Sequence, residues 1–223
     1  MTTVIGDLLP LALGVAISPI PVIATVLMLL APQAKGASLG FLLGWLVGIV
    51  VATTVFVVIA ATTGLDSGSS PSAASAWIKI GLGVLLLLVG AKQWRGRPRP
   101  GEVVVLPKWM AAIDSFTFVK AAGLGFLLAA VNPKNLLMCV AAGSAIGGSG
   151  ISTGDMVVAA AVFTVIAAST VAVPVIGYLV AHERMRNPLD ELRVWLGDNN
   201  ATVMSVLVLV IGVVLIGKGI GGL

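Results

Sequence analysis

Two short polar segments interrupt long apolar runs, and they carry the residues in this chain that are best suited to chemistry. The first is Ser18-Pro19-Ile20-Pro21, and the second is Asn132-Pro133-Lys134-Asn135. A Ser or Asn directly before a Pro is typical of a helix N-cap followed by the first residue of a new helix. Each segment is therefore expected to end one half-helix and to begin another.

The start of each new half-helix favours a negatively charged ligand. A helix N-terminus carries unpaired N–H groups and a partial positive charge, and the Lys134 ammonium adds a full positive charge. A Lys near the bilayer centre costs about 2.5–3.5 kcal/mol, unless its stem reaches an interface, which is a long reach from mid-span. We therefore assign a substrate site for an anionic group to Ser18, Pro19, Pro21, Asn132, Pro133, Lys134 and Asn135.

The acidic residues are placed where they would not form a cation site inside the membrane. Asp7, Asp114 and Asp155 all lie near the ends of apolar runs, and no Asp or Glu lies near the middle of one. The single Cys139 allows neither an intrachain disulfide nor a Cys-rich metal site. We therefore expect no metal and no cofactor.

Two Gly-x-Ser-x-Gly matches, at residues 36–40 and 150–154, resemble the nucleophile elbow of hydrolases. That elbow requires a strand–turn–helix context and a His partner. Here each Ser lies at the start of an apolar run, and His182, the one His in the chain, lies in a segment rich in both acidic and basic residues. We therefore expect a protein that is not an enzyme.

The composition is that of a membrane protein. Apolar residues make up 58 % of the chain and charged residues 10 %, with a mean hydropathy of +1.11, whereas soluble domains contain about 25 % charged residues. Residues 1–223 are therefore expected to form a single domain in the plasma membrane, surrounded by membrane lipids. The net charge of +4 comes largely from the connections, so no nucleic-acid partner is expected.

The hydropathy pattern predicts an all-α fold with six transmembrane helices. A spanning helix needs about 20 apolar residues, and six segments qualify: residues 4–30, 38–62, 76–94, 116–147, 155–180 and 201–221. The first and fourth are the longest, and each has about half a span on either side of its Pro. The two breaks should therefore lie near mid-membrane.

Basic residues gather in alternate connections, which predicts the orientation. They are Lys35 in the first connection, Arg95, Arg97, Arg99 and Lys108 in the third, and Arg184, Arg186 and Arg193 in the fifth. The positive-inside rule places such connections in the cytoplasm. We therefore expect the basic linker, residues 95–115, to be cytoplasmic and both termini to lie outside.

The chain also contains an internal repeat. A shift of 114 residues places Pro19 on Pro133 and Ser18 on Asn132, and it aligns residues 36–40 with 150–154. Each half holds three spans, so the halves would insert with opposite orientations. The prediction is an inverted repeat, as in many secondary transporters, with repeat one at about 1–94 and repeat two at about 116–223.

Gly36, Gly40, Gly44 and Gly48 recur every four residues on one face of the second span. Small residues at this spacing let membrane helices approach closely. We favour packing within the bundle over the alternative, a face for a second copy of the chain in a homodimer.

The two polar segments resemble motifs of the lysine-exporter superfamily, whose members have about six spans in two three-helix repeats. The Pro motif corresponds to Ser18-Pro19-Ile20-Pro21 and the Asn-Pro-Lys motif to Asn132-Pro133-Lys134. The flanking runs, residues 14–22 and 130–135, are most similar to the actinobacterial branch known as glycolipid, peptidoglycolipid or sulfolipid-1-addressing proteins.

This resemblance implies a membrane transporter that exports or flips an anionic cell-envelope glycolipid across the plasma membrane. Metal-exporting relatives need carboxylates within the membrane, thiol-relay relatives need a Cys pair, and an exporter of cationic amino acids would need an acid where this chain has Lys134. An anionic or amphiphilic substrate is therefore favoured. Two alternatives stay open: an exporter of a small metabolite such as an amino acid, and a non-transporting membrane partner of a larger lipid exporter.

Overall fold

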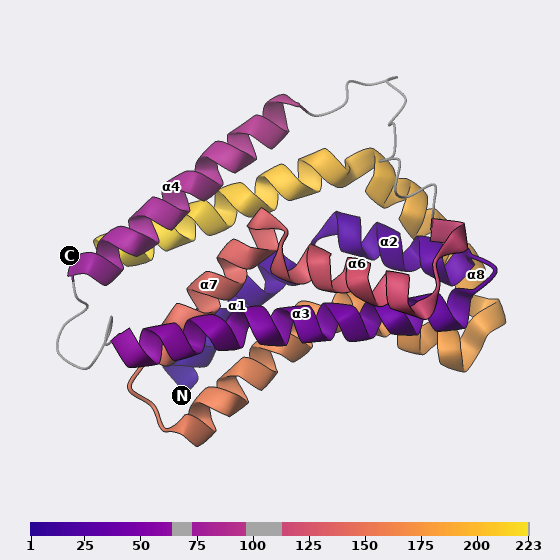
Figure 1. Cartoon of the computed structure of the whole chain (residues 1–223). Coiled ribbons are helices and arrows are strands. Elements are labelled where there is room, and N and C mark those ends of the chain that lie inside the picture. Colours follow the sequence, from indigo (N-terminus) through magenta and orange to yellow (C-terminus); the bar gives the residue numbers. More distant parts are fainter. Residues whose placement is uncertain (64–72, 97–112, 223) are drawn as a thin grey trace.

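The protein folds as an arrangement of helices, seen here in a computed structural model that describes residues 1–63, 73–96 and 113–222 (Figure 1). These residues contain no strand. The elements are α1 (Thr2–Ala16), α2 (Pro19–Leu30), α3 (Ala34–Thr63), α4 (Ala73–Arg95), the 3-10 turn η1 (Ile113–Ser115), α6 (Phe118–Ala130), α7 (Pro133–Gly147) and α8 (Thr153–Ile220).

Both predicted helix breaks are present. The axes of α1 and α2 meet at 51°, and those of α6 and α7 meet at 62°. A Pro occupies the first turn of each second half, after a residue with extended backbone angles. Pro stops a continuous helix because it lacks an N–H and its ring clashes with the preceding turn. The two breaks therefore follow from local sequence.

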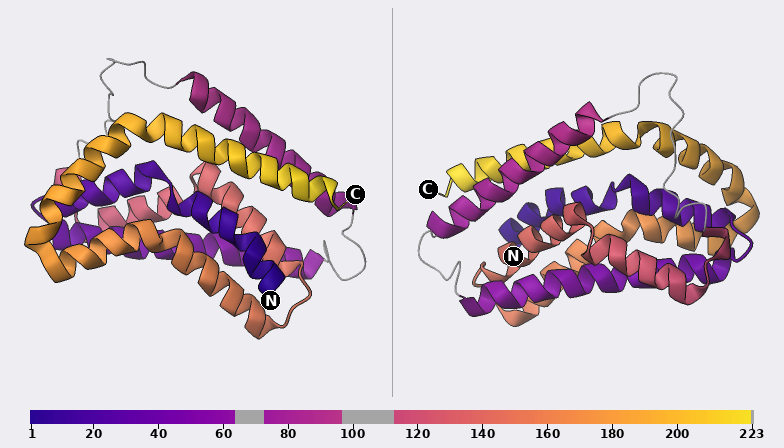
Figure 2. Two further views of the ribbon diagram at one scale, coloured as in Figure 1. Left: turned by 180° about the vertical axis from the view of Figure 1, so that it is seen from behind. Right: turned by 45° about the horizontal axis from the view of Figure 1, so that its top comes forward.

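The connection expected at residues 181–199 is helical instead. It belongs to α8, which runs for 68 residues and has non-helical backbone angles at Ala181 (φ −138°, ψ 50°). Most residues of this segment have ordinary helix propensity, and the helix continues although the segment contains Pro188 and Gly197. α8 curves at this point, so that its last part runs back along the molecule beside α4 (Figure 2).

The apolar helices indicate a multi-pass membrane protein. Among the described residues, three helical segments are long and apolar enough to span a bilayer: Ala34–Thr62, Ala76–Arg95 and Thr153–Ala181. If each bent pair counts as one further span, the number rises to five, by length and composition. The end of α8 contributes only a shorter apolar stretch, Val208–Gly217.

Each long helix packs against the broken pair of the other half. α3 lies along α6 and α7, whereas α8 lies along α1 and α2. The α2–α3 connection and the curved part of α8 lie at one end of the molecule, and both termini lie toward the other (Figures 1 and 2). The basic linker predicted at 95–115 lies outside the described residues, apart from Arg95, Gly96 and residues 113–115.

The Gly series of α3 packs within the bundle, as predicted. A Cβ added to Gly44 would lie 1.9 Å from the carbonyl oxygen of Ala122, and one added to Gly40 would lie 2.2 Å from that of Phe118. A Cβ on Gly48 would meet the Ala129 Cβ of α6 at 2.7 Å, whereas one on Gly36 would have no described residue within 4 Å. The absence of side chains at Gly40, Gly44 and Gly48 therefore sets the close approach of α3 and α6.

Candidate functional site at the two helix breaks

The two breaks, far apart in sequence, meet through their polar side chains. The Lys134 Nζ donates a hydrogen bond of 3.2 Å to the Ser18 Oγ, across 116 residues of chain. Both side chains are buried, with 1 % of Ser18 and 4 % of Lys134 exposed. Lys134 therefore does not reach an interface along its stem, and the snorkelling alternative does not describe this arrangement.

Ser18 occupies the predicted N-cap position of α2, but its side chain does not cap the helix. Its backbone is extended (φ −81°, ψ 106°), and its carbonyl accepts a 3.4 Å bond from the Val22 N–H. The hydroxyl makes no bond to the first turn of α2. It is instead the acceptor for Lys134, so the expected local role of this Ser is replaced by a tertiary one.

Asn132 caps α7 as predicted. Its Oδ1 accepts a 3.1 Å bond from the Lys134 N–H, and its carbonyl accepts a 2.8 Å bond from the Leu136 N–H. Asn132 is half-buried and Pro133 is exposed. These two residues fix the first turn of α7, and so position Lys134, while lying outside the buried Ser18–Lys134 contact.

Asn135 joins the two halves of its own broken helix. Its Nδ2 donates a 2.9 Å bond to the carbonyl of Leu128, one of the carbonyls that the end of α6 leaves without a helical donor. The residue is fully buried, and its Oδ1 has no hydrogen-bond partner among the described residues. Asn135 thus has a structural role through its Nδ2, while its Oδ1 is a buried acceptor one residue after Lys134 in the chain.

Thr170 of α8 contacts the first break, and the sequence did not predict this contact. Its Oγ1 donates a short hydrogen bond to the carbonyl of Ala16, the last residue of α1. Thr in a helix usually bonds the carbonyl of its own preceding turn, as Thr25 and Thr164 do here. Nothing in the sequence distinguishes Thr170 from these.

The first break offers fewer amide donors than expected. Pro19 and Pro21 are buried and have no N–H, and the Val22 N–H is bonded to the Ser18 carbonyl. The first turn of α2 therefore leaves the Ile20 N–H as its remaining donor. The positive character of the site consequently depends on the Lys134 ammonium more than on the N-terminus of α2.

The geometry is that of a buried cation held where two broken helices from different parts of the chain converge. No curated protein and no solved structure matches the chain. The family described as Sap, sulfolipid-1-addressing protein, matches residues 8–221. Because this match covers nearly the whole chain, including both helix breaks, the protein belongs to the sulfolipid-1-addressing protein family.

Proposed function

We propose that this protein exports or flips an anionic cell-envelope lipid or glycolipid across the plasma membrane, and that Lys134 binds the anionic group. The observation that carries the proposal is the buried Lys134–Ser18 contact at the meeting point of the two helix breaks. Membership of the family supports a lipid-related role. Ionisable residues within membrane spans most often mark substrate pathways.

The chemistry of the contact favours exchange with an anion. The Ser18 hydroxyl is a neutral acceptor for the Lys134 ammonium. A phosphate, sulfate or carboxylate oxygen would form a charge-assisted hydrogen bond, which is shorter and roughly twice as strong. An anionic substrate would therefore compete with Ser18 for Lys134 and separate the two breaks.

Separation of the breaks provides a route to alternating access. The two halves are proposed to be an inverted repeat of six spans, the last formed by the end of α8. The reciprocal packing of α3 on α6 and α7, and of α8 on α1 and α2, supports this arrangement. In such transporters the halves rock about a site near mid-membrane, and loss of the Ser18–Lys134 bond would free that movement.

The proposed orientation places the α2–α3 connection in the cytoplasm. Lys35 follows that connection in the first turn of α3, and the connection lies at the same end of the molecule as the basic segment near residues 184–193 (Figures 1 and 2). With both termini at the opposite end, the substrate would enter from the cytoplasmic leaflet and leave outside.

The test is lipid flipping by purified protein in vesicles. Vesicles would carry acyl-labelled fluorescent phosphatidylglycerol or, for comparison, phosphatidylcholine, and dithionite would quench the label in the outer leaflet. We expect the protein to expose the inner-leaflet phosphatidylglycerol to quenching. Lys134→Met should lose this activity, and Lys134→Arg should retain part of it, because the charge survives with different geometry.

The matched control is Lys120→Met, since Lys120 is exposed near the start of α6. It should flip phosphatidylglycerol at the rate of the parent chain. Normal flipping by Lys134→Met would contradict the proposal. Absence of flipping by the parent chain, combined with altered envelope lipids in cells that lack the protein, would instead favour a non-transporting partner of a larger exporter.

A further inference from the structure

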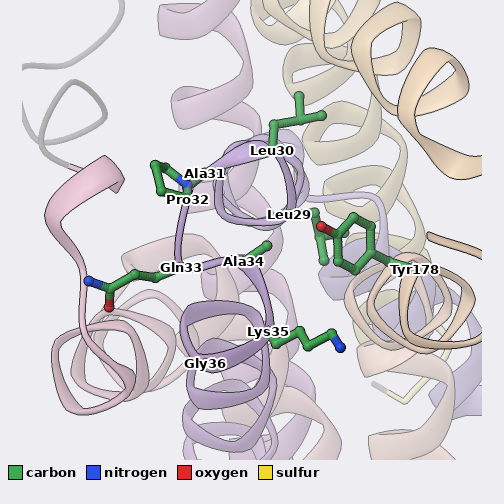
Figure 3. A pocket seen from close by; sticks show the side chains of 9 residues that line it. All are labelled: Leu29, Leu30, Ala31, Pro32, Gln33, Ala34, Lys35, Gly36 and Tyr178. Atoms are coloured by element: carbon green, nitrogen blue, oxygen red, sulfur yellow. The ribbon is translucent and has the colours of Figure 1, made fainter. Parts of the chain in front are cut away.

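A cavity of about 690 Å³ lies away from the helix breaks, at the far end of α2 (Figure 3). Its lining comes from the end of α2, the α2–α3 connection, the start of α3 and Tyr178 of α8. None of these residues belongs to either polar segment. The volume lies within the range of about 300–1,000 Å³ that small-molecule sites occupy.

The cavity combines a cation, a phenol and an apolar wall. Lys35 is exposed, and its side chain extends to the side of the connection on which Tyr178 lies, whereas Gln33 points the opposite way (Figure 3). Tyr178, with 6 % exposed, presents its ring beside Leu29 (Figure 3). A positive group next to an amphipathic ring and leucines suits a charged headgroup with an attached chain.

Its position suits the boundary between membrane and water. Tyr178 lies three residues before Ala181, where the apolar segment Thr153–Ala181 ends, and Lys35 lies at the beginning of the apolar segment Ala34–Thr62. Tyr and Lys are typical of this level, where ring and stem lie in lipid and the polar tip reaches water. A membrane lipid is therefore a better fit than a soluble anion.

We propose that this cavity binds the phosphate, sulfate or carboxylate headgroup of a membrane lipid, with Lys35 as the anion contact and Tyr178 and Leu29 against the lipid chain. The choice of lipid class rests on the proposed function. α2 joins the cavity to the break, and its 12 residues span about 18 Å. A lipid held here would be positioned to enter the membrane beside α2 before its headgroup meets Lys134.

The experiment measures lipid binding in detergent by native mass spectrometry. Every variant carries Lys134→Met, so that the helix breaks contribute no cation. The probes are phosphatidylglycerol, phosphatidylcholine and glycerol 3-phosphate. We expect phosphatidylglycerol to bind, Lys35→Gln to weaken that binding about tenfold, and Lys35→Arg to restore most of it.

Lys120→Gln is the control, because Lys120 is an exposed Lys at the start of α6 and lies outside the cavity. It should leave phosphatidylglycerol binding unchanged, and the unfolding temperature of each variant should match that of the chain that carries Lys134→Met alone. If Lys35→Gln and Lys120→Gln weaken phosphatidylglycerol binding equally, the proposal is overturned, because the lipid would then bind through general surface charge. Glycerol 3-phosphate binding as tightly as phosphatidylglycerol would overturn the lipid assignment.

The two proposals can fail separately. Flipping by the parent chain with no effect of Lys35→Gln on binding would refute the cavity and leave the proposed function standing. Binding that depends on Lys35, in a protein that flips no lipid, would support the cavity while refuting the transport proposal.

Discussion

At the scale of single residues, the polar groups at the breaks form two kinds of contact. Asn132 and Asn135 bond within their own broken helix, to the Lys134 N–H and the Leu128 carbonyl. Ser18 and Thr170 bond across the fold, the first to Lys134 and the second to Ala16. The local contacts shape the breaks, and the tertiary contacts hold the breaks in place.

The Ser18–Lys134 contact should appear as an energetic coupling. Ser18→Ala removes a buried acceptor from an ammonium, which should lower the free energy of unfolding by about 1–3 kcal/mol. Lys134→Met removes a buried charge and should leave the fold as stable or slightly more stable. When Lys134→Met is already present, Ser18→Ala should lower the free energy of unfolding by less than it does alone. The difference between the two losses is the coupling energy, and we expect about 0.5–3 kcal/mol.

The measurement is chemical unfolding of all four proteins in the same detergent, followed by tryptophan fluorescence. Ser149→Ala provides the comparison, because the Ser149 hydroxyl bonds the nearby Ile146 carbonyl and does not reach the breaks. Strict additivity of the Ser18 and Lys134 substitutions would show that the hydrogen bond carries no stability.

At the scale of elements, two devices position the site. The Pro residues turn two long apolar segments into angled half-helices, and the Gly residues of α3 let it lie against α6 with backbone contact. Together they bring the start of α7 to the end of α1. The site thus depends on both the breaks and the close packing.

Removal of a break should stop transport without preventing membrane insertion. Pro133→Ala restores an N–H and relieves the ring clash, so the α6–α7 pair can run on as one helix and carry Lys134 away from Ser18. We expect flipping of phosphatidylglycerol to fall to background at normal membrane levels of the protein. Pro10→Ala, which changes a Pro inside α1 and outside both breaks, should keep most of the activity. Full activity of Pro133→Ala would show that the break is incidental.

The α3–α6 contact should tolerate no added methyl group at Gly44. A Cβ there would lie 1.9 Å from the Ala122 carbonyl oxygen, so the helices must separate, and we expect a loss of about 1–3 kcal/mol in unfolding free energy. Gly123→Ala is the control on α6, because no atom of the described ranges lies within 4 Å of its added Cβ. That variant should be unchanged or slightly more stable. A Gly44→Ala protein as stable as the control would refute the tight contact.

At the scale of the whole molecule, the α2–α3 and α7–α8 connections lie at opposite ends. The α2–α3 connection lies at the end opposite both termini (Figures 1 and 2). Lys35 follows it in the first turn of α3, and the positive-inside rule predicts that this end is cytoplasmic. The α7–α8 connection, with Gly150 at φ +67°, lies toward the end that holds the N-terminus. The orientation therefore makes opposite predictions for these two connections.

Labelling of single Cys residues in intact cells tests this orientation. A membrane-impermeant maleimide should label Gly154→Cys from outside and should leave Gln33→Cys unlabelled until the cells are opened; both positions are exposed. The parent chain serves as the control, since its Cys139 is fully buried. The reverse labelling pattern would invert the proposed direction of transport.

The sequence by itself determined the all-helical membrane class and the two breaks. Both features are local: one depends on runs of apolar residues, the other on the missing N–H of Pro19 and Pro133. They can therefore be predicted without knowledge of the tertiary structure. The cap at Asn132 is local in the same sense, because its acceptor and donor lie two residues apart.

Only the tertiary structure decided which groups meet at the site. Ser18 could equally have capped α2, and its bond to Lys134 exists because α1 and α7 pack together. The same holds for Thr170 against Ala16 and for Lys35 beside Tyr178, where long helices bring distant residues to one level. The helical course of residues 181–199 was also missed, because a polar segment that contains Pro188 and Gly197 is typical of a loop, and yet its other residues are compatible with a helix.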